Sequence, residues 1–176
     1  AENIDKVKEI IFDGISIAGV NTPERIVLSC DEKYLERLKE TLDNHKAKYK
    51  VLPISRAGHS EMMRIIEKQY RNELEKVEFK EGIYDIVSTY EGKKVERNHF
   101  SNPDYWINQM VGTVNFSKAI ESILENDDKD KIFLETGPGK QLTTFAKKHF
   151  RQRKSNLSAI TTIENNNEYE GYLKAL

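Results

Sequence analysis

The first 57 residues carry a hydrophobic pattern that changes between helical and strand spacing. Ile4, Val7 and Ile10 recur at the interval that places them on one face of a helix. The next apolar run alternates like a strand, and Asn21-Thr22-Pro23-Glu24 then predicts a hairpin turn. The whole pattern predicts a helix over residues 2–12, strands over 15–20 and 25–29, a helix over 31–44 and a strand over 48–54. This α-β-β-α-β order is that of a ferredoxin-like lobe that lacks its first strand.

Residues 58–176 contain further elements but no internal repeat. Met62, Met63 and Ile66 begin a broad apolar helix face, on which the two methionines are interpreted as core residues. Asn102-Pro103 is a typical helix start, because asparagine caps the first turn and proline fits it. The pattern predicts helices over residues 60–77, 102–110, 115–125 and 140–149, a short terminal helix, and strands over 84–88, 94–95, 131–136 and 158–163.

The strands near Ile86, Phe133 and Ala159 are expected to form a second α/β layer, so the chain as a whole is predicted to be α/β.

Composition and charge exclude several classes of protein. The 28 basic residues nearly balance the 29 acidic ones, which predicts no binding to nucleic acid or to a membrane by charge alone. A single cysteine, Cys30, excludes an intramolecular disulfide and is typical of a reducing compartment. No apolar stretch approaches the roughly 20 residues of a membrane span, and the N-terminus has no signal-peptide pattern. A cytoplasmic protein is therefore expected.

Candidate chemistry concentrates at Gly58-His59-Ser60, between a predicted strand and a predicted helix. In one interpretation Ser60 is a nucleophile on a sharp strand-to-helix turn. That turn requires a small residue two positions after the serine, and Met62 occupies this position. The favoured interpretation makes His59 a general base and Ser60 the N-cap of the next helix.

Other polar motifs are interpreted as structural. No His, Cys or carboxylate pair has metal-ligand spacing, so we expect no metal and no tightly bound cofactor. Gly137-Pro138-Gly139 lies before a predicted helix, where phosphates can bind, but it lacks the lysine and hydroxyl residue of a P-loop. A structural turn is favoured there. The remaining histidines are expected at the surface, and they are His45, His99 and His149.

Four segments carry a resemblance to a known family. Residues 15–29 contain an apolar strand, an Asn-x-Pro turn and a second strand. Residues 55–63 contain a four-residue signature whose last residue is His59, followed by Ser-x-x-Met. Residues 102–119 contain Asp-Tyr-Trp and Val-x-Phe-x-x-Ala, and residues 133–142 contain Leu-Glu-Thr-Gly-Pro. In this order they resemble the second half of the malonyl-type acyltransferase domains of modular polyketide synthases and fatty acid synthases.

The resemblance implies roles for four residues. In the family a serine attacks the thioester of malonyl coenzyme A, while a histidine, here His59, removes its proton and later activates the phosphopantetheine thiol of an acyl carrier protein. A backbone carbonyl of the Ser88–Gly92 turn is implied to orient the other ring nitrogen, and Thr89 replaces the usual asparagine there. Arg56 and Gly58 belong to the signature that lines the substrate pocket. Gly58 removes bulk, which favours malonyl or a wider extender unit.

The resemblance also implies partners. Residues 1–57 correspond to the small ferredoxin-like subdomain and residues 58–176 to the C-terminal portion of the large one. The family's oxyanion segment, its Gly-His-Ser-x-Gly nucleophile and its malonate-binding arginine have no counterpart here. We therefore expect part of an acyltransferase that is inactive alone, with apolar surface open where the missing N-terminal half and neighbouring synthase domains would lie.

An acyl-CoA thioester is the expected substrate and an acyl carrier protein the expected partner. A basic cluster near the C-terminus could meet the acidic surface of that carrier, and its members are Lys140, Lys147, Lys148, Arg151, Arg153 and Lys154. The alternatives are a non-catalytic remnant that docks a separate acyltransferase or carrier protein, and an unrelated ferredoxin-like binding domain.

Overall fold

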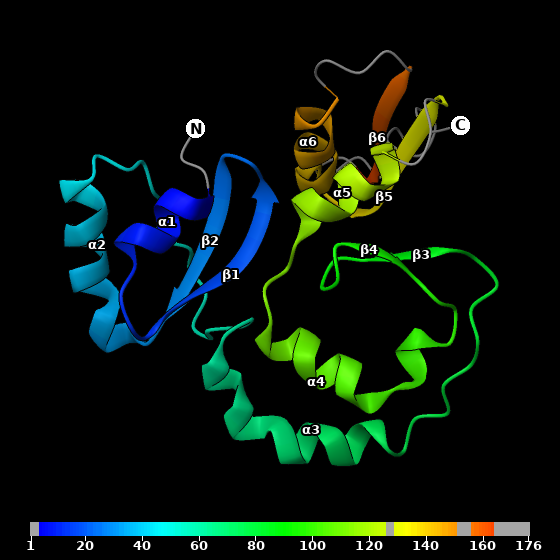
Figure 1. Ribbon diagram of the computed structural model, residues 1–176, viewed down its shortest axis with the longest axis horizontal. Helices are drawn as coiled ribbons and strands as arrows, with labels where there is room; N and C mark the ends of the chain where they lie inside the picture. The colour runs from blue at the N-terminus through cyan, green and yellow to red at the C-terminus, as the bar shows by residue number, and fades with distance from the viewer. Residues whose placement is uncertain (1–3, 126–128, 151–155, 164–176) are drawn as a thin grey trace.

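The computed structural model describes residues 4–125, 129–150 and 156–163. The expected terminal helix lies outside these residues. The elements are α1 (Ile4–Ile10), β1 (Ile15–Thr22), β2 (Arg25–Cys30), the 3-10 turn η1 (Glu32–Tyr34), α2 (Leu35–Asn44), the 3-10 turn η2 (Glu61–Ile66), α3 (Glu67–Leu74), β3 (Ile86–Ser88), β4 (Lys93–Val95), the 3-10 turn η3 (His99–Ser101), α4 (Pro103–Val111), α5 (Phe116–Glu125), β5 (Lys131–Pro138), α6 (Gln141–Lys148) and β6 (Leu157–Ile163). The predicted α/β class is confirmed (Figure 1).

The N-terminal part is a hairpin with two helices beside it (Figure 1). Strands β1 and β2 pair antiparallel, from Ile15 opposite Cys30 to Thr22 opposite Arg25, as the alternating pattern predicts. The Asp31 carboxylate accepts a hydrogen bond from the Lys33 amide at 3.0 Å and so begins the turn that leads into α2. Four of the five elements expected in the ferredoxin-like lobe are therefore present.

The fifth expected element, a strand over residues 48–54, is not formed, and this prediction is wrong. Within the described part of the chain, no ladder includes these residues. Their large apolar side chains are 43–67% exposed, and they are Tyr49, Val51, Leu52 and Ile54. A strand needs a neighbour that exchanges backbone hydrogen bonds with it, and the pattern of one segment cannot supply that neighbour.

The helix expected over residues 60–77 is split. Its first part is the 3-10 turn η2, and only residues 67–74 form the α-helix α3. Ile65 is 91% exposed and Met62 is 38% exposed, so the interpretation of Met62 as a core residue is wrong. The segment packs on α4, and these two side chains are not covered by it.

Helix α4 lies beside α3 and ends next to the hairpin (Figure 1). The Asn102 side chain accepts from the Asp104 amide at 2.9 Å and Pro103 occupies the first turn, as predicted. After α4, Val114 exchanges two backbone hydrogen bonds with β1, donating to Ala18 at 2.9 Å and accepting from Val20 at 2.8 Å. The C-terminal end of α4 is thus attached to the hairpin.

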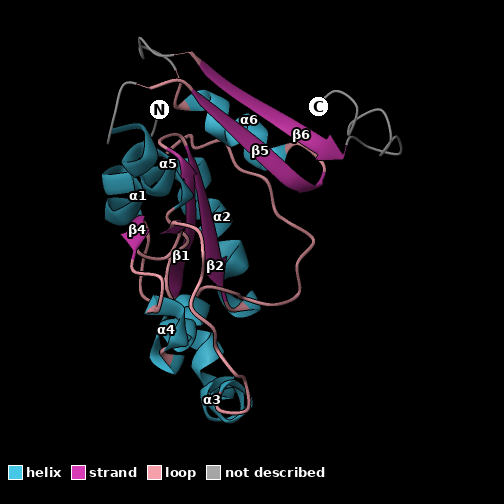
Figure 2. Ribbon diagram, turned by 90° about the vertical axis from the view of Figure 1, so that its right-hand side faces the viewer, coloured by secondary structure: helices cyan, strands magenta, loops and turns pink. Residues whose placement is uncertain are grey.

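The C-terminal part is a parallel pair, β5 and β6, packed against α5 and α6 (Figure 2). Its core contains Ile120, Leu124, Ala146 and Ala159. The strand at Ile86 pairs with β4 in a separate hairpin, so its expected place in the layer with β5 and β6 is wrong. A three-residue strand that already has a sequence neighbour as its partner does not need the long-range pairing.

The histidines differ from the surface positions expected of them. His45 is exposed, as predicted. His149 is only 9% exposed, because the end of α6 packs on α5, and its Nδ1 lies 3.5 Å from the Glu121 carboxylate. His99 is half-buried and packs edge-to-face on Tyr105, with ring centroids 5.0 Å apart. The surface prediction is therefore wrong for His149 and incomplete for His99.

Glu135 of β5 occupies the amino end of α6. Its carboxylate accepts from the Thr143 amide at 2.8 Å and from the Leu142 amide at 3.1 Å. These are amides that a bound phosphate would use, which supports the structural interpretation of the Gly-Pro-Gly turn. Partial burial raises the pKa of Glu135, but the hydrogen bonds from α6 outweigh it and hold the pKa below its ordinary value.

Replacing Glu135 with glutamine is expected to lower the free energy of unfolding at neutral pH by about 1 kcal/mol, the usual value of such a cap. Because the folded-state pKa is lowered, the stabilisation is present above the ordinary value of 4.5 and disappears as the pH falls through the folded-state pKa. Urea unfolding at pH 7 and at pH 3 measures this, with exposed Glu40→Gln as the control. An equal difference between the Glu135 variant and the wild type at both pH values would contradict the cap.

Candidate functional site

His59 lies in a tight turn that other segments hold in place. Its φ is 56°, a left-handed conformation that is uncommon for a residue with a side chain. The Ser60 hydroxyl donates to the Ala57 carbonyl at 2.6 Å and closes the turn. The Ser29 hydroxyl of β2 donates to the Gly58 carbonyl at 3.0 Å, and the His59 amide donates to the Met110 carbonyl at 3.2 Å. The strained backbone of His59 is thus fixed from three directions.

Ser60 is neither a nucleophile nor a side-chain cap. It is 1% exposed, so its hydroxyl is not accessible to a substrate. The residue occupies the position before η2, but its side chain makes no capping hydrogen bond, because the hydroxyl donates to Ala57 instead. The predicted capping hydrogen bond of the Ser60 side chain is therefore not formed, and the hydroxyl instead stabilises the turn that carries His59.

The imidazole of His59 is oriented by the end of α4. Its Nδ1 lies 3.1 Å from the Gln109 carbonyl oxygen and 3.2 Å from the Gly112 carbonyl oxygen. Carbonyls near a helix C-terminus have no partner in their own helix, and both can only accept. The geometry therefore assigns the ring hydrogen to Nδ1 and leaves Nε2 as the basic nitrogen of the neutral ring.

The contact expected between His59 and a backbone carbonyl of the Ser88–Gly92 turn does not form. The carbonyls of Gln109 and Gly112 face the imidazole instead, and the Thr89 carbonyl accepts from the Asn115 amide at 2.6 Å. The prediction of a backbone carbonyl as the partner was correct in kind and wrong in position. The two carbonyls at α4 have no side-chain signature, because every residue carries a backbone carbonyl.

An open cavity of about 370 Å³ lies beside His59. Besides His59, it is lined by Gly58, Met63, Ile66, Tyr70, Gln109 and Met110. The lining is mainly apolar and includes the imidazole of His59, so the cavity can contact an apolar part of a ligand next to this ring. A β-carbon at Gly58 would have nothing within 4 Å, so the backbone there accepts a larger side chain.

The structure brings only part of the predicted site together. Gly58 lines the cavity with His59, whereas Arg56 is exposed and is not among the lining residues. Thr89 is half-buried in the β3–β4 turn and is likewise not among the lining residues. Tyr70 and Gln109 were not predicted, since their helices showed only an ordinary apolar pattern.

Over residues 4–125, 129–150 and 156–163, no three His, Cys, Asp or Glu side chains are grouped so that they could hold a metal ion. Across the same ranges, none of the helices has the length and hydrophobicity to cross a membrane.

Comparison with known proteins gives a consistent result. Residues 2–172 match the family model described as the acyl transferase domain. The PKS-NRPS hybrid synthetase acdB of Aspergillus candidus is 32% identical over 124 residues, which are 70% of this chain and 5% of that protein. This chain therefore spans a small part of that relative.

Two solved structures have the same fold. The acyl transferase domain of SpnD, in complex with 2-(pent-4-yn-1-yl)malonyl, superimposes with a TM-score of 0.86 at 21% identity, covering 98% of this chain and 44% of that one. The malonyl CoA-acyl carrier protein transacylase of Clostridium perfringens gives a TM-score of 0.80 at 24% identity, covering 99% of this chain and 54% of that one.

Proposed function

This chain belongs to the acyl transferase domain family, and from that membership we propose that it supplies the general base and the acyl pocket of a polyketide synthase acyl transferase. The reaction transfers a malonyl-type unit from coenzyme A to the phosphopantetheine of an acyl carrier protein. The observation that carries the proposal is the orientation of His59, whose Nδ1 faces two carbonyls at 3.1 and 3.2 Å beside an open cavity.

The proposed mechanism uses Nε2 of His59 twice. In the first step Nε2 takes the proton of a serine hydroxyl as the serine oxygen attacks the thioester carbon, and coenzyme A leaves as the thiol with that proton. In the second step Nε2 takes the proton of the carrier's thiol as its sulfur attacks the acyl-serine. The serine leaves with this proton, and the enzyme returns to its starting state. The two carbonyls at Nδ1 stabilise the ring in each step because they remain acceptors when the imidazole is protonated.

We propose that the serine nucleophile lies in a segment outside this chain. Ser60 is excluded by its burial and its bond to Ala57, although its Gly-His-Ser sequence resembles an elbow. Coverage of 44% of the SpnD domain leaves room for a further segment in a complete domain. We place the boundary between the small and large subdomains near residue 57.

Open apolar side chains support a segment that covers part of this chain. Ile65 of η2 is 91% exposed, Ile132 of β5 is 73% exposed and Ile54 is 67% exposed. Single exposed apolar side chains are ordinary on a protein surface, and a contiguous apolar face is the feature that indicates burial by another segment. Parallel strands such as β5 and β6 are usually covered on both faces, and here one face of β5 carries Ile132 and Leu134 exposed.

The basic residues of α6 support an acyl carrier protein as the partner. Lys140, Lys147 and Lys148 are exposed in or next to this helix. A carrier with an acidic surface would meet them favourably. The other three residues of the predicted cluster lie outside the described residues. Arg56 is exposed and two residues before Gly58 in the sequence, and we propose its guanidinium as a partner of the substrate carboxylate.

The proposed substrate is a malonyl-type thioester, and Gly58 sets the width of its pocket. A Gly58→Phe variant is expected to keep malonyl transfer and to lower kcat/KM for substituted malonyl units about 10- to 100-fold, because the ring would fill space beside the acyl group. Competition between malonyl and substituted malonyl coenzyme A measures this in the full-length polypeptide, by which we mean the complete acyl transferase that contains this chain. Gly58→Ala is the control. Equal use of both substrates by Gly58→Phe would contradict this role.

The experiment that tests the function follows radiolabelled malonyl coenzyme A in the full-length polypeptide. Label is expected on a serine other than Ser60 and then on an added acyl carrier protein. Absence of label from both would contradict the proposed function and favour the alternative, a non-catalytic module that docks a separate acyltransferase or carrier. Label on Ser60 would contradict the assignment of the nucleophile.

A further inference from the structure

Tyr90 and Gly112 form a close contact next to His59. A β-carbon added at Gly112 would overlap the Tyr90 ring edge and would lie 2.7 Å from the Asn108 carbonyl oxygen. Real β-carbons do not approach other atoms so closely, so only glycine lets the ring rest on the backbone here. The carbonyl of the same glycine accepts from Nδ1 of His59 at 3.2 Å. The Tyr90 ring therefore lies against a residue that holds the imidazole.

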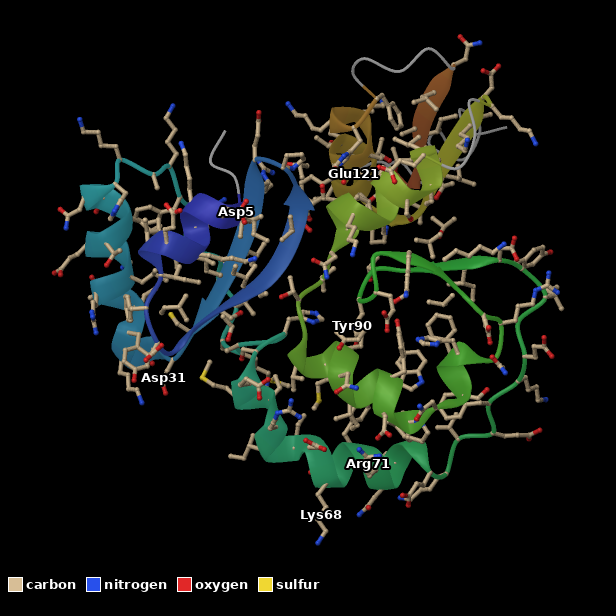
Figure 3. All side chains as sticks on the ribbon, viewed as in Figure 1. Asp5, Asp31, Lys68, Arg71, Tyr90 and Glu121 are labelled. Carbon is tan, nitrogen blue, oxygen red and sulfur yellow. The ribbon has the colours of Figure 1, made fainter. Side chains whose placement is uncertain are left out.

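The turn that carries Tyr90 is attached to two helices. The Tyr90 ring meets Tyr105 of α4 edge-to-face, with centroids 6.0 Å apart, and the Ser88 hydroxyl lies 2.8 Å from the Tyr105 hydroxyl. Asn115, directly before α5, donates its amide to the Thr89 carbonyl at 2.6 Å and its side chain to the Tyr90 carbonyl at 3.1 Å. Figure 3 shows Tyr90 between the β3–β4 turn and α4. The hydrogen bonds to the backbone of the turn and the edge-to-face contact with Tyr105 together hold the Tyr90 ring in place.

We propose that Tyr90 and Gly112 are positioning residues for His59, an inference that rests on the proposed role of His59 as the general base. The fixed Tyr90 ring packs on Gly112, and this contact sets the position of the last turn of α4. The Gln109 and Gly112 carbonyls then accept the Nδ1 hydrogen, and Nε2 stays basic. The β3–β4 turn thus positions the histidine through the Tyr90 ring, while the carbonyls that face the imidazole belong to Gln109 and Gly112.

The first test is kinetic and compares three variants in the full-length polypeptide. Tyr90→Ala is expected to lower kcat for malonyl transfer roughly 10- to 100-fold with little change in KM, because a displaced base costs rate and leaves substrate binding intact. Tyr90→Phe keeps the ring and is expected to match the wild type. Tyr84→Ala removes a tyrosine that is 76% exposed just before β3, and is the control for a change of surface residue.

The second test reads the imidazole directly. Diethyl pyrocarbonate adds carbethoxyl groups to unprotonated imidazole nitrogens, and peptide mass spectrometry counts them on His59. The wild type and Tyr90→Phe are expected to gain one group, on Nε2, because the carbonyl oxygens at 3.1 and 3.2 Å leave the reagent no room to reach Nδ1. Tyr90→Ala is expected to gain a second group on Nδ1. Exposed His45 is the internal reference for reagent concentration.

The outcomes separate this inference from the proposed function. Unchanged kcat and a single modification in Tyr90→Ala would overturn the positioning role even where His59→Ala abolishes transfer. Full transfer by His59→Ala would instead overturn the proposed function. If Tyr90→Ala does not fold, Tyr90→Leu, which keeps apolar volume and loses the flat ring, is measured in the same way, and a wild-type result would again overturn the role.

Discussion

Replacement of His59 by alanine is expected to lower the rate of malonyl transfer by the full-length polypeptide about 10²- to 10⁴-fold, the range that a general base contributes. A serine hydroxyl is a weak nucleophile until a base takes its proton, so both the acylation and the transfer step should slow. KM for malonyl coenzyme A is expected to change little, because the imidazole acts on the reacting hydroxyl. The measurement is the rate at which label passes from malonyl coenzyme A to an acyl carrier protein.

Two controls make this result specific. His45→Ala removes an exposed histidine at the end of α2 and is expected to leave the rate unchanged. His59→Gln keeps an amide nitrogen near the α4 carbonyls but supplies no base, so it should be as slow as His59→Ala. A rate within a factor of about two of the wild type in either His59 variant would contradict general-base catalysis by this residue.

The secondary structure followed from the sequence wherever the signal was local. Asn102 caps the helix that it was expected to cap, and Asp31 caps the turn at the start of the predicted helix 31–44, because a short side chain finds its amide within two residues. The strand expected at residues 48–54 failed for the opposite reason. Its apolar pattern was clear, but a strand forms only with a partner, and pairing depends on residues far away in the sequence.

Only part of the candidate site could be predicted from the sequence. The signature before His59 located this residue and Gly58, which line one cavity, whereas Arg56 and Thr89 of the same prediction do not line it. The partners of Nδ1 could not be predicted, since they are backbone carbonyls of Gln109 and Gly112, 50 and 53 residues further along the chain. Any residue can supply such a carbonyl, so only the packing of α4 against the His59 turn decides which ones do.

Replacement of Gly112 by alanine is expected to affect both stability and rate. The added β-carbon would overlap the Tyr90 ring and lie 2.7 Å from the Asn108 carbonyl, and neither neighbour is free to move away. Overpacking of this kind typically costs about 1–3 kcal/mol of unfolding free energy. Because the Gly112 carbonyl must shift with its backbone, kcat is expected to fall roughly 10- to 100-fold as well.

Gly137→Ala is the matched control for this change, since its new β-carbon would meet nothing within 4 Å. It adds the same methyl group away from the cavity beside His59 and is expected to keep both the unfolding free energy and kcat close to those of the wild type. Urea unfolding and transfer kinetics of the two variants measure the difference. Equal stability and equal kcat in Gly112→Ala and Gly137→Ala would contradict the close contact at Gly112.

The double variant Tyr90→Ala/Gly112→Ala separates packing from positioning. Without the ring, the closest overlap with the new methyl group is removed, so the double variant should lose less unfolding free energy than the sum of the losses in the two single variants. The remaining contact with Asn108 keeps this coupling incomplete. The rate should stay low, because the ring that sets the Gly112 carbonyl is gone. If kcat of the double variant instead recovers to that of the wild type, the Tyr90 ring fills space beside Gly112 without positioning His59.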